Sequence, residues 1–271
     1  MPELPEIANL ARQMDRELVG RRIAAVDIGQ PKCLNMPAED LRALTLGARV
    51  ANVTARGKWL FARLDNDAVF LLNLGMGGEA LFHEAGATLP DHCQAAVFFE
   101  DGTAFSLHFW WFGYVHAVRA ADSASHAMTA TLGMDPLNDR EFTRDAFERL
   151  LMHKKRSTVK SVLMDQKNIA GIGNVYIQDI LFAARVHPLC KVVDLSPVER
   201  TALYDAIPSQ LQHALDLGGL AYEKDLYGCS GGFKDFLVGY REGKPCPVCG
   251  TLVQKIRTGG TASFICPHCQ V

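Results

Sequence analysis

The chain has 271 residues, of which 48% are hydrophobic, and its formal net charge is −2. This length suggests one large or two ordinary domains, and the hydrophobic content is enough to build real cores. No apolar run reaches transmembrane length, and no basic and apolar signal peptide opens the sequence. We therefore expect a soluble, cytoplasmic protein with no membrane partner. We also predict that it is a monomer.

The two parts of the chain differ in charge. Residues 142–271 contain 16 Lys/Arg and 12 Asp/Glu, whereas residues 1–141 contain 12 Lys/Arg and 18 Asp/Glu. This modest asymmetry allows a local basic surface in the C-terminal part, without requiring one.

The first six residues combine an amine with two carboxylates. If Met1 is removed, Pro2 presents a secondary amine, and an α-amino group titrates near pH ~8. Such an amine attacks electrophilic carbon and forms an iminium. The spacing of Glu3 and Glu6 puts both acids on one helix face, close to the amine. The alternative is ordinary helix-start chemistry, in which proline and first-turn carboxylates only stabilise the helix.

Apolar periodicity predicts a helix over residues 5–19, followed by many short strands. Asp101-Gly102 predicts a hairpin between two of these strands. The pattern favours a β-sandwich or flattened barrel. The predicted strands are 23–28, 49–54, 59–65, 69–74, 95–100, 103–109 and 114–118.

The periodicity becomes helical from Phe142 onward, so we place a domain boundary near residues 135–141. The stretch Gly218–Gly232 is predicted to be a long loop, and such loops are usually functional or mobile. The predicted helices are 143–153, 158–165, 174–184 and 197–217. The predicted domains are an N-terminal catalytic β-sandwich over 1–135, a helical domain over 136–237 and a zinc finger over 238–271.

Four of the eight cysteines have metal-ligand spacing. They form C-x2-C-x16-C-x2-C, which predicts one tetrahedral zinc ion on two knuckles of a β-hairpin. A closed set of four thiolates leaves no open coordination position, so this zinc is expected to be structural. The four ligands are Cys246, Cys249, Cys266 and Cys269.

A glycine-bearing turn between two predicted helices is the second strong motif. Asn174 suits the N-cap of the second helix, and Gly171 and Gly173 permit close approach of a phosphate to backbone amides. The alternative is a helix–turn–helix packed only for structure.

Five ordered motifs together resemble the formamidopyrimidine-DNA glycosylase (Fpg, MutM) and endonuclease VIII family, and favour its Fpg branch. They are Pro2–Glu6, Arg56–Lys58, Leu74–Met76, Gly171–Tyr176 and the terminal finger ending Cys269-Gln270. The resemblance spans the whole chain. It implies an α+β fold: an N-terminal β-sandwich with flanking helices, a C-terminal helix–two-turn–helix region and a four-cysteine zinc ribbon.

The resemblance also implies roles in catalysis. Pro2 matches the nucleophile that forms a Schiff base with the sugar, Glu3 the acid that assists ring opening, and Glu6 a supporting carboxylate. Lys58 matches a hairpin lysine near the lesion. The implied activity is a bifunctional glycosylase and abasic-site lyase that excises oxidised bases of the formamidopyrimidine and 8-oxoguanine type by β,δ-elimination.

Damaged double-stranded DNA is the implied partner, and the target nucleotide has to leave the base stack. On the helix–two-turn–helix, Asn174 matches a phosphate contact, and Asp179 replaces a family glutamate. The family resemblance places the enzyme in the bacterial cytoplasm, on the nucleoid when DNA is bound. The further residues implied in DNA binding are Lys160, Gly173 and Tyr176.

Three positions depart from the family pattern. Thr261 stands where the family's finger has an arginine, and Arg257 is the nearest cationic substitute. Trp110 and Trp111 replace the arginine-bearing loop that probes the duplex, and Asn73 replaces a histidine.

Met76 and Phe112 remain as wedges, and the aromatic run from Trp110 to Phe112 is expected to stack on bases. A buried strand end is the alternative reading of that run. Two further hypotheses remain. One is a catalytically weak or altered-specificity DNA-damage binder, whose partners include abasic or single-stranded DNA. The other is a zinc-ribbon DNA-binding regulator.

Overall fold

The structure is a computed structural model, and it describes residues 1–138 and 140–271. The chain forms two compact units. The first contains residues 1–131 and 217–232, and the second contains residues 132–216 and 233–271. Residues 217–232 are called the strap below. The three predicted domain ranges stay a prediction, and the strap groups with the first unit rather than with the helices around it in sequence.

The first unit is a β-sandwich of two antiparallel four-stranded sheets. One sheet has the order β1 (Ile23–Ile28), β6 (Ala95–Phe99), β7 (Ala104–His108), β5 (Glu79–His83). The other has the order β2 (Val50–Arg56), β3 (Trp59–Leu64), β4 (Ala68–Asn73), β8 (Tyr114–Arg119). Its helices are α1 (Leu4–Leu18), η1 (Pro31–Cys33), α2 (Ala38–Thr45) and η2 (Ala120–Ser125).

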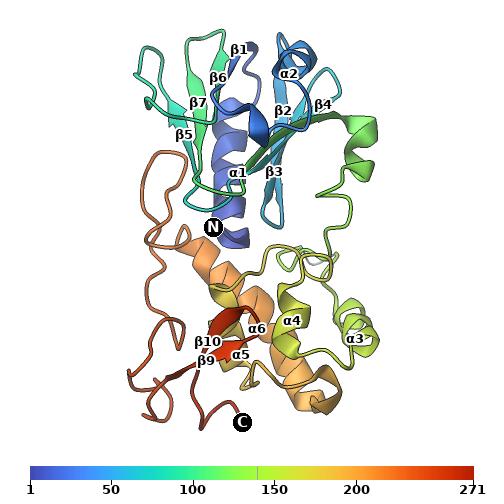
Figure 1. Ribbon diagram of the computed structural model, residues 1–271, viewed down its shortest axis with the longest axis vertical. Helices are drawn as coiled ribbons and strands as arrows, with labels where there is room; N and C mark the ends of the chain where they lie inside the picture. The colour runs from blue at the N-terminus through green and yellow to red at the C-terminus, as the bar shows by residue number, and fades with distance from the viewer. Residues whose placement is uncertain (139) are drawn as a thin grey trace. The chain divides into compact units, whose positions relative to one another are not determined.

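One hydrophobic core joins the two sheets and α1. Leu72 from β4, Leu107 from β7 and Met14 from α1 are all buried in it. Helix α1 runs along β2 and β3 (Figure 1), so its apolar face completes the sandwich. The predicted hairpin at Asp101-Gly102 is confirmed: Gly102 has φ +85°, which glycine adopts without a steric penalty.

The second unit is helical and carries the C-terminal hairpin. Its helices are α3 (Arg144–His153), α4 (Val159–Met164), α5 (Tyr176–Ala183), η3 (Val192–Asp194) and α6 (Pro197–Asp216), and its strands are β9 (Gln254–Thr258) and β10 (Thr261–Ile265). Helices α5 and α6 pack together (Figure 1). The hairpin shares a small core with α5 through Phe182, Val253 and Phe264. The predicted α+β fold class is confirmed.

Two expectations about local structure were incomplete. Helix α2 and strand β5 were not predicted, because both are short and only part of each is buried. The predicted N-cap at Asn174 is wrong: the residue before α5 is Val175, and Asn174 uses its side chain elsewhere.

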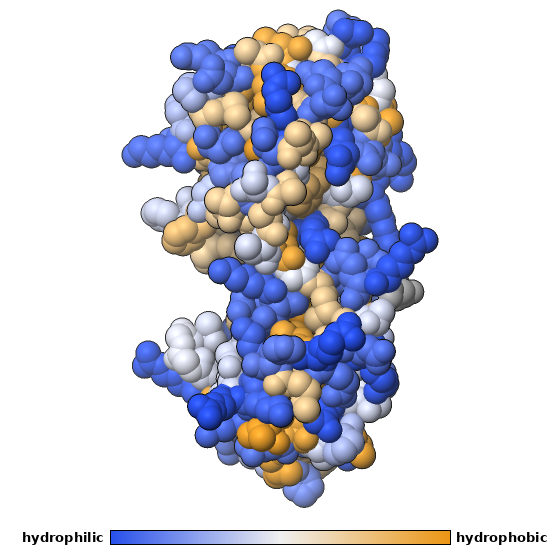
Figure 2. Space-filling view, turned by 90° about the vertical axis from the view of Figure 1, so that its right-hand side faces the viewer, coloured by the Kyte–Doolittle hydropathy of each residue, from blue (hydrophilic) through white to orange (hydrophobic). Residues whose placement is uncertain are grey.

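Within residues 1–138 and 140–271, the structure contains no helix long and apolar enough to span a bilayer. On the face drawn in Figure 2, apolar side chains occur in small groups separated by hydrophilic ones.

Candidate active site and DNA interface

The start of α1 is closed by two buried carboxylates. The Glu3 side chain accepts the backbone N–H of Glu6, and Glu6 Oε2 accepts the backbone N–H of Glu3 at 2.8 Å. This reciprocal arrangement is a capping box. Glu3 is 2% exposed and Glu6 is 4% exposed. The helix-start interpretation is therefore confirmed, and the amine-site interpretation of the same two side chains stays a prediction.

Glu6 also binds the strap. Its Oε1 accepts the backbone N–H of Leu220 at 3.1 Å. Gly219 has φ +89°, and a Cβ at that position would lie 2.9 Å from Glu6 Oε1. Only glycine therefore lets the strap approach the carboxylate this closely.

Pro2 is buried directly before these carboxylates. The Met1 amine nitrogen lies 3.5 Å from Glu223 Oε1 on the strap. The structure thus brings three acidic residues to the amino terminus, where the sequence indicated only two. Glu223 is more than 200 positions away along the chain, and no local pattern could have found it.

Lys58 lies in the tight turn between β2 and β3 and is partly exposed. Asn73 Nδ2 donates to the Lys58 carbonyl at 2.9 Å, and Asn73 Oδ1 accepts the N–H of Gly75 at 3.0 Å. Asn73 therefore fixes the lysine turn to the start of the Met76 loop with one buried amide.

The two loops that carry the aromatic run are paired at their tips. Met76 N–H donates to the Trp111 carbonyl at 2.8 Å, and Trp110 N–H donates to the Met76 carbonyl at 2.9 Å. Trp110 is 71% exposed, Trp111 66%, Phe112 69% and Met76 47%. The reading of this run as a buried strand end is wrong. It is an exposed apolar surface on a hydrogen-bonded support.

Two backbone features hold this aromatic surface in place. A Cβ on Gly77 would lie 2.7 Å from Trp110 Cδ2, so the indole ring lies directly on the Gly77 backbone. Phe112 has φ +58°, which is unusual for a bulky residue. Strain of this kind persists only where the surrounding structure enforces it.

In the second unit, Lys160 is buried beneath the β9–β10 hairpin. Lys160 is 4% exposed. Its ammonium donates to three hydroxyls, one amide oxygen and one carbonyl. These acceptors are Asn174 Oδ1 at 2.8 Å, Thr258 Oγ1, Thr261 Oγ1 and the Ala262 carbonyl at 3.0 Å each, and Ser263 Oγ at 2.7 Å.

This cluster joins α4, the turn before α5 and the hairpin through one cation. Burial lowers the pKa of Lys160 from 10.5 to about 8, so the side chain is still charged at neutral pH. Gly173 and Tyr176 are buried as well. Of the four residues predicted to bind DNA in this region, Asn174 is partly exposed. Lys160, Gly173 and Tyr176 are buried beneath the surface.

The hairpin register separates Thr261 from Arg257. Thr261 pairs with Thr258, whereas Arg257 pairs with Ala262. Because side chains alternate across a strand, Arg257 projects from the face opposite to Thr261. Arg257 is exposed, and together with Lys255 and Thr261 it borders a pocket of about 430 Å³.

The four predicted zinc ligands come together at the base of the hairpin. All four sulfur atoms lie within 4.8 Å of one another. Three of the Sγ–Sγ distances are 3.5, 3.5 and 4.0 Å. Tetrahedral Zn–S bonds of about 2.3 Å require sulfur atoms about 3.8 Å apart. The site therefore fits one structural zinc ion.

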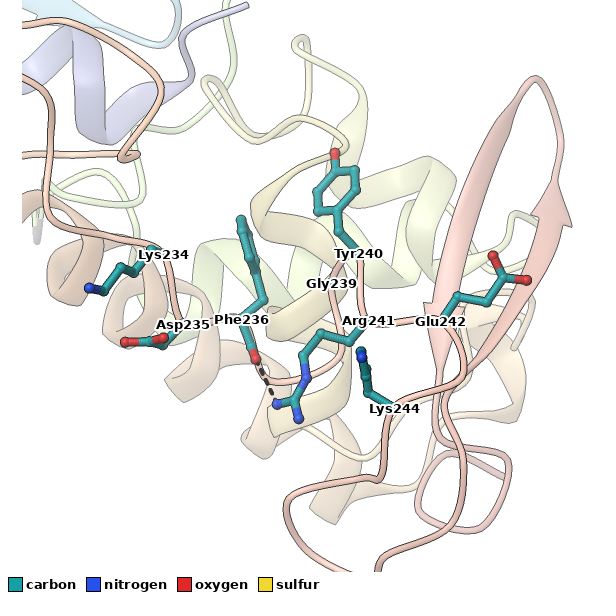
Figure 3. A pocket seen from close by; sticks show the side chains of 8 residues that line it. All are labelled: Lys234, Asp235, Phe236, Gly239, Tyr240, Arg241, Glu242 and Lys244. Carbon is teal, nitrogen blue, oxygen red and sulfur yellow. Dashed lines mark hydrogen bonds between the residues drawn. The ribbon is translucent and has the colours of Figure 1, made fainter.

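A pocket of about 530 Å³ lies beside the segment that leads into the zinc site (Figure 3). Arg241 lines it, but its Nη1 donates to the Phe236 carbonyl at 3.0 Å and its Nη2 to the Pro245 carbonyl at 3.2 Å. Asp179 fixes the same segment by accepting the backbone N–H groups of residues 237–239 at 2.8–2.9 Å. Burial raises the pKa of Asp179, and these three donors oppose the rise. The Arg241 side chain at this pocket and the Asp179 side chain therefore hold the segment that leads into the zinc site.

Three family profiles match the chain in order. The formamidopyrimidine-DNA glycosylase N-terminal domain matches residues 1–109, its H2TH domain matches 132–225, and the zinc finger found in FPG and IleRS matches 243–271. The formamidopyrimidine-DNA glycosylase of Gluconobacter oxydans is 37% identical, with both chains fully covered. The chain belongs to the formamidopyrimidine-DNA glycosylase family. The Bacillus cereus enzyme of the same name is 31% identical over 100% of this chain and 99% of its own.

Solved structures of Lactococcus lactis Fpg agree with this family assignment. The complex with N7-benzyl-Fapy-dG DNA has a TM-score of 0.90 at 26% identity, and 99% of each chain is covered. The complex with abasic-site DNA gives the same values. The Fpg family resemblance seen in the sequence is confirmed.

Replacing Lys160 by Met should destabilise the second unit. The change removes all five hydrogen bonds of the buried ammonium, and the loss of a buried hydrogen-bond donor costs about 1–3 kcal/mol. We expect a loss of about 2–3 kcal/mol in the free energy of unfolding, measured with urea at pH 7. Lys167→Met, at an exposed lysine of the following turn, is the matched control and should change stability little.

The same pair of proteins tests the pKa of Lys160. Because this pKa is about 8 in the folded protein and 10.5 unperturbed, the folded state loses its proton first as pH rises. The unfolding free energy of the wild type should therefore rise between about pH 8 and pH 10 relative to that of Lys160→Met. A constant difference across this range would contradict the assignment.

Replacing Cys249 by Ser should release the zinc. We expect about one zinc per chain in the wild type by metal analysis, and loss of both the metal and DNA affinity in the variant. The first unit should keep its β-sheet circular dichroism, because its core contains no residue of the finger. Cys229→Ser, at an exposed cysteine of the strap, should keep the metal.

Proposed function

We propose that the protein is a bifunctional DNA glycosylase and abasic-site lyase that excises oxidised bases of the formamidopyrimidine and 8-oxoguanine type in base excision repair. The observation that carries this proposal is Pro2 beside the buried carboxylates of Glu3 and Glu6 at the start of α1. Once Met1 is removed, Pro2 supplies the nucleophile, Glu3 exchanges protons with it, and Glu6 holds the helix start in place.

The sequence of steps follows from the amine chemistry. Pro2 attacks the sugar C1′ as the damaged base leaves. The resulting iminium activates the sugar for β- and δ-elimination. Glu3 assists ring opening, and Glu6 holds the helix start and the strap in place. Lys58, on a turn tied to the Met76 loop by Asn73, is assigned to the lesion and its phosphate.

Damaged double-stranded DNA is the proposed partner. The support is the relatives' DNA complexes, together with the exposed surface of Met76, Trp110, Trp111 and Phe112. Asn174, Thr261 and Arg257 are assigned to the phosphate backbone, and Lys160, Gly173 and Tyr176 support that contact from within the second unit. We place the enzyme in the cytoplasm, on the nucleoid when DNA is bound.

The second candidate function is damage recognition with weak catalysis or altered specificity. The observation that favours it is the aromatic surface, because indole rings stack on any base and do not read its hydrogen-bonding edge. Thr261 adds to this argument, since its hydroxyl is already engaged by Lys160 and it carries no charge for a phosphate.

Borohydride trapping tests the nucleophile. Wild-type protein lacking Met1, confirmed by mass spectrometry, should form a covalent adduct with duplex DNA containing an abasic site, and Pro2→Gly should trap far less. Lys58→Ala is the companion variant and should still trap. Equal trapping by wild type and Pro2→Gly would assign the adduct to another amine.

Single-turnover cleavage of 8-oxoguanine opposite each of the four bases tests the specificity. We expect little discrimination between opposite bases, weak activity opposite cytosine, and relatively better activity on abasic or single-stranded sites, where flipping costs least. A missing charge-assisted phosphate contact costs roughly 1.5–3 kcal/mol, or about ten- to hundredfold in affinity. Thr261→Arg should recover part of this loss on duplex DNA.

Fast cleavage confined to the 8-oxoguanine:cytosine duplex would contradict this specificity. It would also mean that a residue outside the aromatic surface recognises the base opposite the lesion.

A further inference from the structure

The strap lies along one polar stripe of α1. Asn9 Nδ2 donates to the Gly218 carbonyl at 3.4 Å, and Gln13 Oε1 accepts the N–H of Leu226 at 2.9 Å. Further along the helix, the Tyr227 hydroxyl donates to Glu17 Oε1 at 2.6 Å. With Glu6, these residues recur every three or four positions, which is the spacing of one helix face.

The strap is fixed in position by burial as well as by these bonds. Leu226 is fully buried in the core of the first unit, among side chains of both sheets. Lys224 Nζ binds Glu79 Oε1 of β5 at 2.8 Å. Glu223, the residue before Lys224, is therefore held at a defined place.

Glu223 faces the amino terminus from that place. Its side chain is 11% exposed, and Oε1 lies 3.5 Å from the Met1 nitrogen. Removal of Met1 moves the amine one residue along the chain, and consecutive Cα atoms are about 3.8 Å apart. To stay beside the amine, the Glu223 carboxylate has to follow it over about this distance by turning its side-chain torsions.

Charged side chains near Glu223 come from three elements. Glu3 is the N-cap of α1 and Glu6 lies in its first turn, Glu79 comes from β5, and Lys224 from the strap itself. Burial raises the pKa of Glu223, the carboxylates of Glu3 and Glu79 raise it further, and the terminal ammonium lowers it. A raised pKa suits a carboxylate that exchanges protons near neutral pH.

The proton count of the proposed reaction requires more than one carrier. A protonated Pro2 amine holds two hydrogens, whereas the iminium that it forms with C1′ holds none. One hydrogen leaves before the nitrogen attacks C1′, because a protonated amine has no lone pair, and the other leaves as the N–C1′ double bond forms. The glycosidic bond and the C1′–O4′ bond break, and the departing base and O4′ each take up one proton. Charge and protons balance with two transfers away from nitrogen and two toward oxygen and the base.

We propose that Glu223 is the second proton acceptor of the Pro2 amine, beside Glu3. This inference rests on the proposed role of Pro2 as nucleophile. Glu223 takes one proton from the ammonium and so frees the nitrogen lone pair for attack on C1′, and it later returns this proton to water. Glu3 takes the second proton as the iminium forms and passes it to O4′, and the departing base takes its proton from water. Glu6 has no such freedom, because its two oxygens are held by Glu3 and Leu220.

The test compares three variants of the processed protein. Glu223→Gln keeps the shape and removes the base, and Glu223→Asp keeps the base on a shorter stem. Tyr227→Phe removes a strap-to-helix bond and leaves the carboxylate in place. Base release under single-turnover conditions is followed from pH 5 to pH 9, and the pKa of the Pro2 amine is measured by NMR with ¹⁵N-proline.

Glu223→Gln should lower the plateau rate about ten- to hundredfold, within the range of general base catalysis. Since a carboxylate favours the charged amine, its removal should also lower the pKa of the Pro2 amine. Glu223→Asp should recover part of the rate, and Tyr227→Phe should match the wild type in both measurements.

Two results would overturn the inference. An unchanged rate and amine pKa in Glu223→Gln would remove Glu223 from proton transfer. Equal losses in Glu223→Gln and Tyr227→Phe, with an unchanged amine pKa, would assign the effect to strap docking. Failure of the proposed function is distinct from both, because then the wild type itself would form no borohydride-trapped adduct.

Discussion

The carboxylate of Glu6 is the point on which the proposed catalytic site depends. One oxygen closes the start of α1 by accepting the Glu3 N–H, and the other accepts the Leu220 N–H of the strap. A buried carboxylate needs such donors, since an unpaired one would cost several kcal/mol. The Glu6 side chain therefore fixes both the start of α1, directly after Pro2, and the position of the strap.

Much of the fold could be predicted because its determinants are local. The strands of the sandwich alternate or run apolar over a few residues, and the predicted strand at 23–28 has the observed bounds. The four cysteines carry their geometry in their spacing, and the structure brings their sulfur atoms to tetrahedral separations. Glu3 and Glu6 were found because three residues separate them on one helix.

The rest of the site depends on contacts between distant parts of the chain. Glu223 reaches the amino terminus because Leu226 is buried in the first unit and the strap is bonded to α1, and a loop sequence does not reveal which core will bury it. Asn174 was predicted to cap a helix, but its side-chain oxygen accepts a hydrogen bond from the Lys160 ammonium instead. The exposure of the aromatic run depends on pairing between two loops, which composition alone leaves open.

The discontinuity of the first unit has a consequence for how the protein is made. Synthesis delivers residues 1–131 first, then all of residues 132–216, and only afterwards the strap. During that interval the sandwich lacks Leu226, and Glu6 lacks the Leu220 N–H. The first unit is therefore completed after the helices of the second have left the ribosome. A nascent chain that stops before residue 217 holds Pro2, the proposed nucleophile, in an unfinished setting, so we expect the proposed cleavage of DNA to arise late in translation.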